Sequence, residues 1–121
     1  MASFPSIQFV LIRGNHDILD QENYQAKNLE YYPETLILEP FILTHIPLES
    51  ASEYYNICGH IHPGVRLRGK GLQAIKLPCF HFSAYRLVLP AFGAFTGTAR
   101  IEPDKEDSIF AIAEDKVVRV N

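Results

Sequence analysis

The sequence predicts an α/β fold that is dominated by β-strands. Two observations support this prediction: the apolar residues gather in short runs of strand-forming types, and turn residues separate these runs. Helix is expected in only two short segments, residues 20–30 and residues 48–55. The first of them is polar and begins with Asp20, a residue type that caps helix N-termini.

Length and composition indicate one soluble domain that covers residues 1–121. Hydrophobic residues make up 47% of the chain and charged residues 21%, as in ordinary globular proteins. The formal net charge of -3 gives no strong overall attraction for a polyanion, although a local basic stretch could still contact phosphate.

Strands are predicted wherever apolar runs are bounded by turn residues. Residues 7–13 form a near-continuous apolar run, which is typical of a strand buried on both faces. Residues 35–38 and 41–44 flank Glu39-Pro40 and predict a hairpin. Residues 91–98 are expected to form a packed loop, and His62-Pro63-Gly64 a turn. The remaining strands are expected at residues 56–59, 77–82, 86–89, 109–113 and 116–120, the last two as a second hairpin.

Two cysteines, Cys58 and Cys79, are expected to be reduced thiols rather than a disulfide, and Cys58 to be buried and inert. The N-terminus has no basic segment followed by an apolar one, as a signal peptide would. No apolar run approaches the roughly 20 residues that cross a bilayer. We therefore expect a cytoplasmic protein without a membrane partner.

Three short polar motifs each follow a predicted strand: Gly14-Asn15-His16-Asp17, Thr44-His45 and Gly59-His60-Ile61-His62. Each motif alone is compatible with an ordinary turn, because Asn and Asp favour turn conformations. Together they place several imidazoles, a carboxamide and a carboxylate at strand ends. Neutral imidazoles suit Mn, Fe or Zn, so the three motifs favour a metal or phosphate site.

The order of these motifs resembles the second half of the calcineurin-like metallophosphoesterase superfamily. Residues 57–65, 77–80 and 89–97 are similar to the ligase-associated DNA-damage-response phosphoesterases, a bacterial family described as endonucleases. The resemblance implies the C-terminal half of the metallophosphoesterase β-sandwich with flanking helices. It also implies metal-dependent hydrolysis of phosphoesters, with DNA as a candidate substrate.

The resemblance assigns four metal ligands. Asn15, His45 and His60 match ligands of the second metal, and His62 matches the last ligand of the first metal. The full family site holds two divalent transition-metal ions, Mn, Fe or Zn, which activate a bridging water and hold the phosphoryl oxygens.

The resemblance also assigns two catalytic residues. His16 matches the histidine that contacts the phosphate and assists the leaving group, and Asp17 would hold the His16 ring in its working tautomer. Arg66 is a separate candidate for substrate binding, because Arg66, Arg68 and Lys70 alternate just after the histidine pair. A solvated strand face is the preferred interpretation of that alternation.

Two motifs of the superfamily, Asp-x-His and Gly-Asp, do not occur in the chain. They supply two aspartates, one of which bridges the metals, so at most one ion and little activity are expected of these 121 residues. The alternative function is a non-catalytic metal-binding or oligomerising module. Residues 7–13 would then expose an unpaired strand edge, which predicts a homodimer or other self-association.

Overall fold

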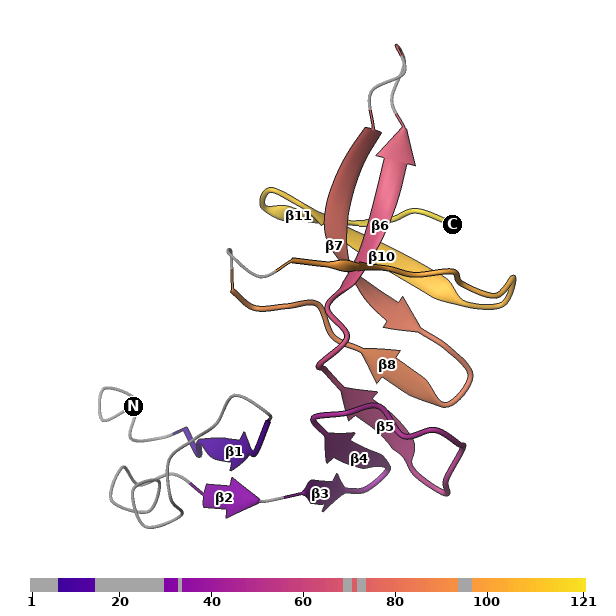
Figure 1. The fold of residues 1–121 in the computed structure, drawn as a ribbon. Coiled ribbons are helices and arrows are strands. Elements are labelled where there is room, and N and C mark those ends of the chain that lie inside the picture. The colour runs from indigo at the N-terminus through magenta and orange to yellow at the C-terminus, as the bar shows by residue number, and fades with distance from the viewer. Residues whose placement is uncertain (1–6, 15–29, 33, 69–70, 72–73, 94–96) are drawn as a thin grey trace.

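The computed structural model describes residues 7–14, 30–32, 34–68, 71, 74–93 and 97–121. The regular secondary structure of these described residues consists of β-strands alone (Figure 1). The strand-rich character is therefore confirmed, whereas the flanking helices of the expected α/β fold are not. The predicted helix at residues 20–30 lies outside the described residues except for Glu30, which begins a strand. No helix in the described residues is long and apolar enough to cross a membrane.

Seven strands follow one another across the main sheet in the order β11-β10-β7-β8-β5-β4-β3 (Figure 1). The β3–β4 hairpin around Glu39-Pro40 is confirmed, and so is the β10–β11 hairpin. The strands of this path are β3 (Thr35–Leu38), β4 (Phe41–Thr44), β5 (Tyr55–Cys58), β7 (Ala74–Phe82), β8 (Arg86–Val88), β10 (Ser108–Ala113) and β11 (Lys116–Arg119).

The long strand β7 joins two parts of the sheet. Its first residues pair antiparallel with β6 (Pro63–Arg68), and its last residues pair with β10 and β8. The short strand β9 (Ala99–Arg100) pairs parallel with the start of β6. The β6–β7 hairpin therefore extends away from the other strands (Figure 1). The turn predicted at residues 62–64 is wrong, because Pro63 already lies in β6.

Three parallel neighbours position the polar motifs. Strand β4 pairs parallel with β5, and β5 pairs parallel with β8. The carboxyl ends of parallel strands meet at one edge of a sheet, which is where open α/β sheets commonly bind ligands. The segments that follow β4 and β5 contain the second and third motifs.

Residues 48–55 are not helical, contrary to the prediction, because distant groups take their backbone hydrogen bonds. The Leu48 N–H donates to the side chain of Asn56 at 3.0 Å. The Leu48 carbonyl accepts from the Arg86 guanidinium at 2.9 Å. Ser52 and Tyr54 bond each other locally, and Tyr55 already belongs to β5. The contacts of Leu48 with Asn56 and Arg86 thus use the backbone groups with which this segment would begin a helix.

The N-terminal strand β1 (Val10–Ile12) pairs parallel with β2 (Glu30–Tyr32) in a separate two-stranded sheet. The side chain of Val10 is 40% exposed and that of Ile7 is 53% exposed. The expected burial of residues 7–13 on both faces is therefore wrong within the described residues. The strand itself is confirmed, although it is shorter than the apolar run.

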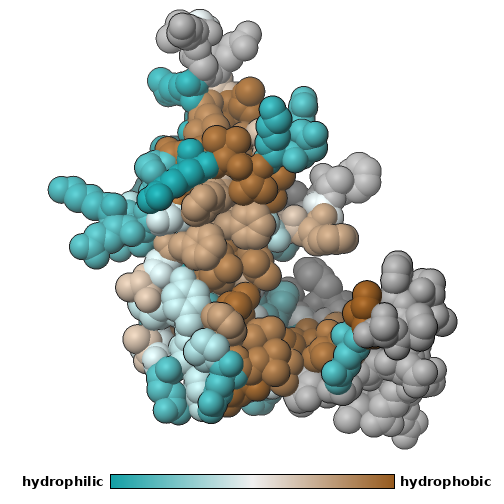
Figure 2. All heavy atoms as spheres, turned by 180° about the vertical axis from the view of Figure 1, so that it is seen from behind, coloured by the Kyte–Doolittle hydropathy of each residue, from teal (hydrophilic) through white to brown (hydrophobic). Residues whose placement is uncertain are grey.

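The buried apolar side chains all belong to the main sheet. They lie on five strands, β5, β6, β7, β8 and β10: Cys58, Pro63, Cys79, Val88, Ile109 and Ala111. Along β10, buried positions alternate with half-exposed ones. Figure 2 shows a hydrophobic band that runs along one face of the molecule. The loop at residues 91–98 is not packed as predicted at Phe92, whose side chain is fully exposed, and residues 94–96 lie outside the described residues.

Both cysteines are free, as predicted, and the predicted burial of Cys58 is confirmed; Cys79 is buried as well. Burial raises the pKa of the Cys58 thiol to about 11, although the Arg86 guanidinium acts in the opposite direction. Burial also raises the pKa of the Cys79 thiol to about 11. Both thiols are therefore protonated at neutral pH, which makes them inert core residues.

Candidate metal centre at the ends of two parallel strands

His45 and His60 come together where β4 and β5 end. His45 directly follows β4, and His60 lies two residues beyond β5. The Gly59 N–H donates to the His45 carbonyl at 2.9 Å, so the two strands stay paired past their last ladder residues. The Nε2 atom of His45 then lies 3.2 Å from Nδ1 of His60, with the two rings nearly perpendicular.

The separation of these two nitrogens suits a shared metal ion. Two imidazole ligands at about 2.0–2.1 Å from one ion, at octahedral or tetrahedral angles, are roughly 2.9–3.4 Å apart. The observed 3.2 Å falls within this range. The same distance also allows one protonated ring nitrogen to donate a hydrogen bond to the other. The donor set and its spacing therefore fit two ligands of one transition-metal ion.

The third motif forms a strained turn rather than the end of a strand. His60 has a φ of 72° and His62 a φ of 55°, both in the left-handed region that non-glycine residues rarely adopt. The Ile61 N–H donates to the Gly59 carbonyl at 2.9 Å and closes the turn. Such conformations cost on the order of 1–3 kcal/mol each and cluster at functional sites.

A buried asparagine fixes the backbone on both sides of His45. Asn56 is 1% exposed, and its Nδ2 donates to the Ile42 carbonyl and to Thr44 Oγ1, each at 3.0 Å. Its Oδ1 accepts from the Leu48 N–H. Thr44 in turn donates to the Ile46 carbonyl at 2.7 Å. Sequence reasoning treated Asn56 only as a strand residue; an amide within an apolar run was the available signal.

The first motif reaches the same place through Gly14. A side-chain carbon at this position would lie 2.9 Å from both Cε1 and Nδ1 of His45, so only the glycine backbone fits against the ring. Gly14 immediately precedes Asn15, His16 and Asp17, which lie outside the described residues. The backbone that leads into the first motif therefore lies beside the second one.

A hollow of about 460 Å³ opens next to His45, and Arg13 and Glu34 line it together with Gly14. Sequence reasoning missed Arg13 and Glu34. Arg13 stands directly before the Gly14 motif, and that adjacency was the signal that could have identified it. Its guanidinium places a permanent positive charge on the wall of this hollow.

In the described part of the chain, His62 does not join His45 and His60 as a third metal ligand. No group of three or more His, Cys, Asp or Glu side chains there is arranged to hold a metal ion. The His62 carbonyl instead accepts from the Ala99 N–H at 2.8 Å, which ties the turn to β9. Of the four predicted metal ligands, the structure thus brings His45 and His60 together, and Asn15 lies outside the described residues.

Arg66 and Arg68 are both exposed on β6 and alternate with half-buried neighbours. This pattern matches the solvated strand face that the sequence favoured. Lys70 lies outside the described residues.

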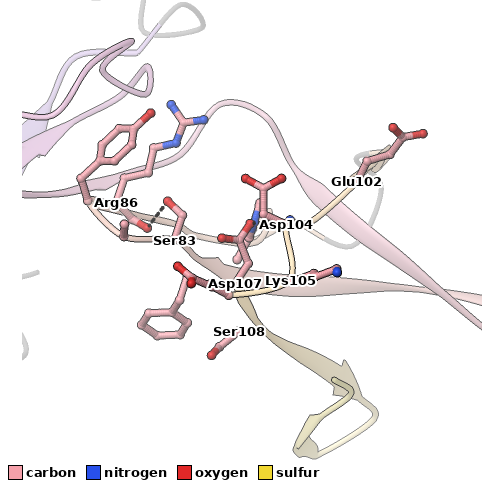
Figure 3. Close-up of a pocket in the computed structure, with 12 residues that line it drawn as sticks. Ser83, Arg86, Glu102, Asp104, Lys105, Asp107 and Ser108 are labelled. Atoms are coloured by element: carbon pink, nitrogen blue, oxygen red, sulfur yellow. Dashed lines mark hydrogen bonds and ion pairs between the residues drawn. The ribbon is translucent and has the colours of Figure 1, made fainter.

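A second hollow, of about 700 Å³, lies beside the charged turn that precedes β10 (Figure 3). Asp107 anchors this turn, because its Oδ2 accepts from His81 Nε2 at 2.7 Å and from the Asp104 N–H at 3.1 Å. Across the hollow, Ser83 bonds the Arg86 carbonyl at 3.2 Å. None of the predicted site residues lines this hollow, and its polar groups hold the turn against β7.

Among known proteins, the similarity found is to solved structures. No protein-family model matches the sequence, and no curated protein matches it. Among solved structures, the crystal structure of Pseudomonas putida nuclease MPE resembles this chain with a TM-score of 0.78 and 31% sequence identity. The match covers 98% of this chain and 57% of that chain, so the chain spans little more than half the length of that nuclease. It therefore has a fold similar to part of a nuclease.

Proposed function

We propose that this chain carries part of a metal-dependent phosphoesterase centre that acts on nucleic acid. The observation that supports it best is the pair of imidazoles, with nitrogens 3.2 Å apart, at the ends of two parallel strands. The similarity to a Pseudomonas putida nuclease supports phosphoester hydrolysis and a nucleic acid substrate. The finer assignment, to the ligase-associated phosphoesterases of the calcineurin-like superfamily, rests on the motifs.

His45 and His60, with Asn15, would hold one divalent ion of Mn, Fe or Zn, and His62 would belong to a second ion's site. When bound, such ions activate a water and neutralise the charge that develops on the phosphoryl oxygens. Since the chain has no Asp-x-His and no Gly-Asp, we propose that it holds at most one ion.

The chain's own residues would then perform three tasks. The Asn56 hydrogen bonds fix the backbone around His45, so its ring needs little reorganisation to bind. His16, oriented by Asp17, would donate a proton to the leaving oxygen of the substrate. Arg13, on the wall of the same hollow as His45, would bind a phosphate oxygen through its guanidinium.

Turnover of a chromogenic phosphodiester in Mn²⁺ tests this function. We expect these 121 residues alone to give a rate near the uncatalysed background, because two imidazoles do not make a two-metal centre. Robust turnover that His60→Ala abolishes would place a complete centre in this chain. Robust turnover that His45→Ala and His60→Ala leave unchanged would contradict the proposed site.

An oligomerising module is the second candidate, and the exposed apolar side chains favour it. Ile7 and Val10 near β1 and Ile37, Leu38 and Phe41 on the β3–β4 hairpin are between 39% and 54% exposed. Apolar surface of this kind commonly marks a protein interface. We propose self-association through the β1 edge, and the molar mass in light scattering at micromolar concentration tests it.

A further inference from the structure

Three cationic side chains from three neighbouring strands line one small hollow. Arg66 of β6, Lys76 of β7 and Arg100 of β9 surround a space of about 140 Å³, and Gly64 is the remaining residue that lines it. We call this space the cationic hollow. All three cations are exposed, and none of the residues that line the hollow is acidic. The chain as a whole carries a net charge of -3, so this concentration of positive charge is local.

The strand register brings these cations together. Arg66 and Lys76 are direct cross-strand partners in the β6–β7 hairpin, and Arg100 is the partner of Gly64 on β9. Like charges directly opposite each other destabilise a sheet. Within the described residues, no salt bridge to a carboxylate offsets this repulsion. Among the described residues, Lys76 Nζ donates to the Thr98 carbonyl alone, at 2.7 Å, and this neutral acceptor holds the ammonium without neutralising its charge.

Gly64 allows the strands to approach closely at the hollow. A side-chain carbon at position 64 would lie 2.6 Å from Thr98 Oγ1 and 3.3 Å from Lys76 Cε. Such a carbon would force the Thr98 side chain to move and would crowd the lysine stem. The absence of a side chain at Gly64 therefore keeps the three cations around one space.

We propose that the cationic hollow binds a phosphate of a nucleic acid strand that also reaches the His45–His60 pair. This inference rests on the proposed function, because it assigns a second contact to the same substrate. Strand β6 starts directly after His62 and rises about 3.3 Å per residue, so Arg66 lies within roughly 13 Å of His62. One strand of nucleic acid has a phosphate about every 3.4 Å along its axis and spans that distance in roughly four nucleotides.

Binding of a fluorescent oligothymidylate, followed by anisotropy over a series of salt concentrations in EDTA, tests this proposal. The triple variant Arg66→Gln/Lys76→Gln/Arg100→Gln should lose about tenfold or more in affinity at low salt. The slope of log K against log salt should become shallower by about 0.7, the change expected when one phosphate is no longer neutralised. Arg68→Gln is the matched control for Arg66→Gln alone, because each removes one positive charge from β6 and only Arg66 lines the hollow. Arg68→Gln should change affinity less than about twofold, and Arg66→Gln should lose more.

Two further variants separate this proposal from the proposed function. His45→Ala and His60→Ala should remove Zn²⁺ binding, whereas the triple variant is assayed for oligonucleotide affinity in EDTA, where no metal ion contributes. If the triple variant binds the oligonucleotide as wild type does, or Arg68→Gln loses as much as Arg66→Gln alone, the cationic hollow is not the phosphate site. That result would leave the metal centre standing. Conversely, the triple variant could lose oligonucleotide affinity while His45→Ala and His60→Ala both keep wild-type Zn²⁺ binding. That result would support the cationic hollow and contradict the metal centre.

Discussion

The β1–β2 sheet and the sheet around β7 differ in how they bury apolar side chains. The buried apolar side chains of the described residues lie on β5, β6, β7, β8 and β10, whereas Val10 on β1 is 40% exposed. The main sheet thus supplies its own core, whereas none of the β1 side chains is buried. The candidate metal centre lies where the two meet, because Gly14 packs against the His45 ring. A functional site can therefore depend on a region that contributes little to the core.

The largest difference between the regions should appear in stability. Ile109 is 1% exposed, so Ile109→Ala should lower the free energy of unfolding by about 2–5 kcal/mol through lost burial and a residual cavity. Val10→Ala, at a half-exposed site, should cost less than about 0.5 kcal/mol. Urea unfolding of both variants measures the difference. Equal losses would mean that β1 belongs to the same core.

The hydrogen bonds of Asn56 should contribute the next largest effect. Asn56→Ala leaves the Leu48 N–H, the Ile42 carbonyl and Thr44 Oγ1 without their buried partner. We expect a loss of about 2–3 kcal/mol, because unsatisfied buried groups keep their desolvation cost. Ser52→Ala removes only exposed local hydrogen bonds and serves as the control. A loss no greater than that of the control would show that Asn56 does not fix the end of β4.

The two buried thiols should make the main sheet sensitive to alkali. Burial raises the folded-state pKa of Cys58 and of Cys79 to about 11, above the value near 9 of an exposed thiol. A raised pKa stabilises the fold below the unfolded-state value, and this contribution is lost as the pH rises toward the folded value. Between about pH 8 and pH 10 each thiol should remove on the order of 1 kcal/mol. Urea unfolding midpoints at pH 8 and pH 10 measure this loss of stability. The prediction is refuted if the wild-type midpoint falls no further between the two pH values than that of a Cys58→Ala/Cys79→Ala variant.

Self-association should depend on the exposed apolar residues of β1 and not on those of β11. If the β1 edge pairs with a second copy, light scattering at micromolar concentration should give about twice the monomer mass. Val10→Asp should shift the protein to monomer. Val117→Asp, at a 58% exposed position on β11, is the matched control and should leave the mass unchanged. A strictly monomeric wild type, or equal effects of both variants, would contradict pairing through β1.

Local signals predicted much of this fold. The hairpin around Glu39-Pro40 was read from apolar runs on either side of a turn, and the register Thr35↔Thr44 to Leu38↔Phe41 bears it out. The resemblance to the metallophosphoesterases assigned His45 and His60 to one metal, and the structure brings their rings together. What the sequence could not reveal depends on long-range contacts. Leu48 is held by hydrogen bonds to the side chains of Asn56 and Arg86. No local pattern predicts these partners, and Arg86 lies 38 residues further along the chain.

The start of β6 shows the same limit. Pro63 and Gly64 are turn-forming types, yet both are buried in a strand, because β7 and β9 pair on its two sides. The turn occurs earlier, at His60 and His62, where left-handed backbone would ordinarily favour glycine. Residue preferences therefore placed the turn in the nearest proline and glycine rather than in the histidine motif.

Calorimetric titration with Zn²⁺ tests most directly whether His45 and His60 form a metal-binding pair. We predict one bound ion near neutral pH, with affinity that falls on acidification because each imidazole must lose its proton to bind. His45→Ala or His60→Ala alone should weaken binding by about tenfold or more. His81→Gln should leave it unchanged, since His81 pairs with Asp107 at the other hollow. Zn²⁺ binding that persists at wild-type affinity in the His45→Ala/His60→Ala double variant would contradict the account.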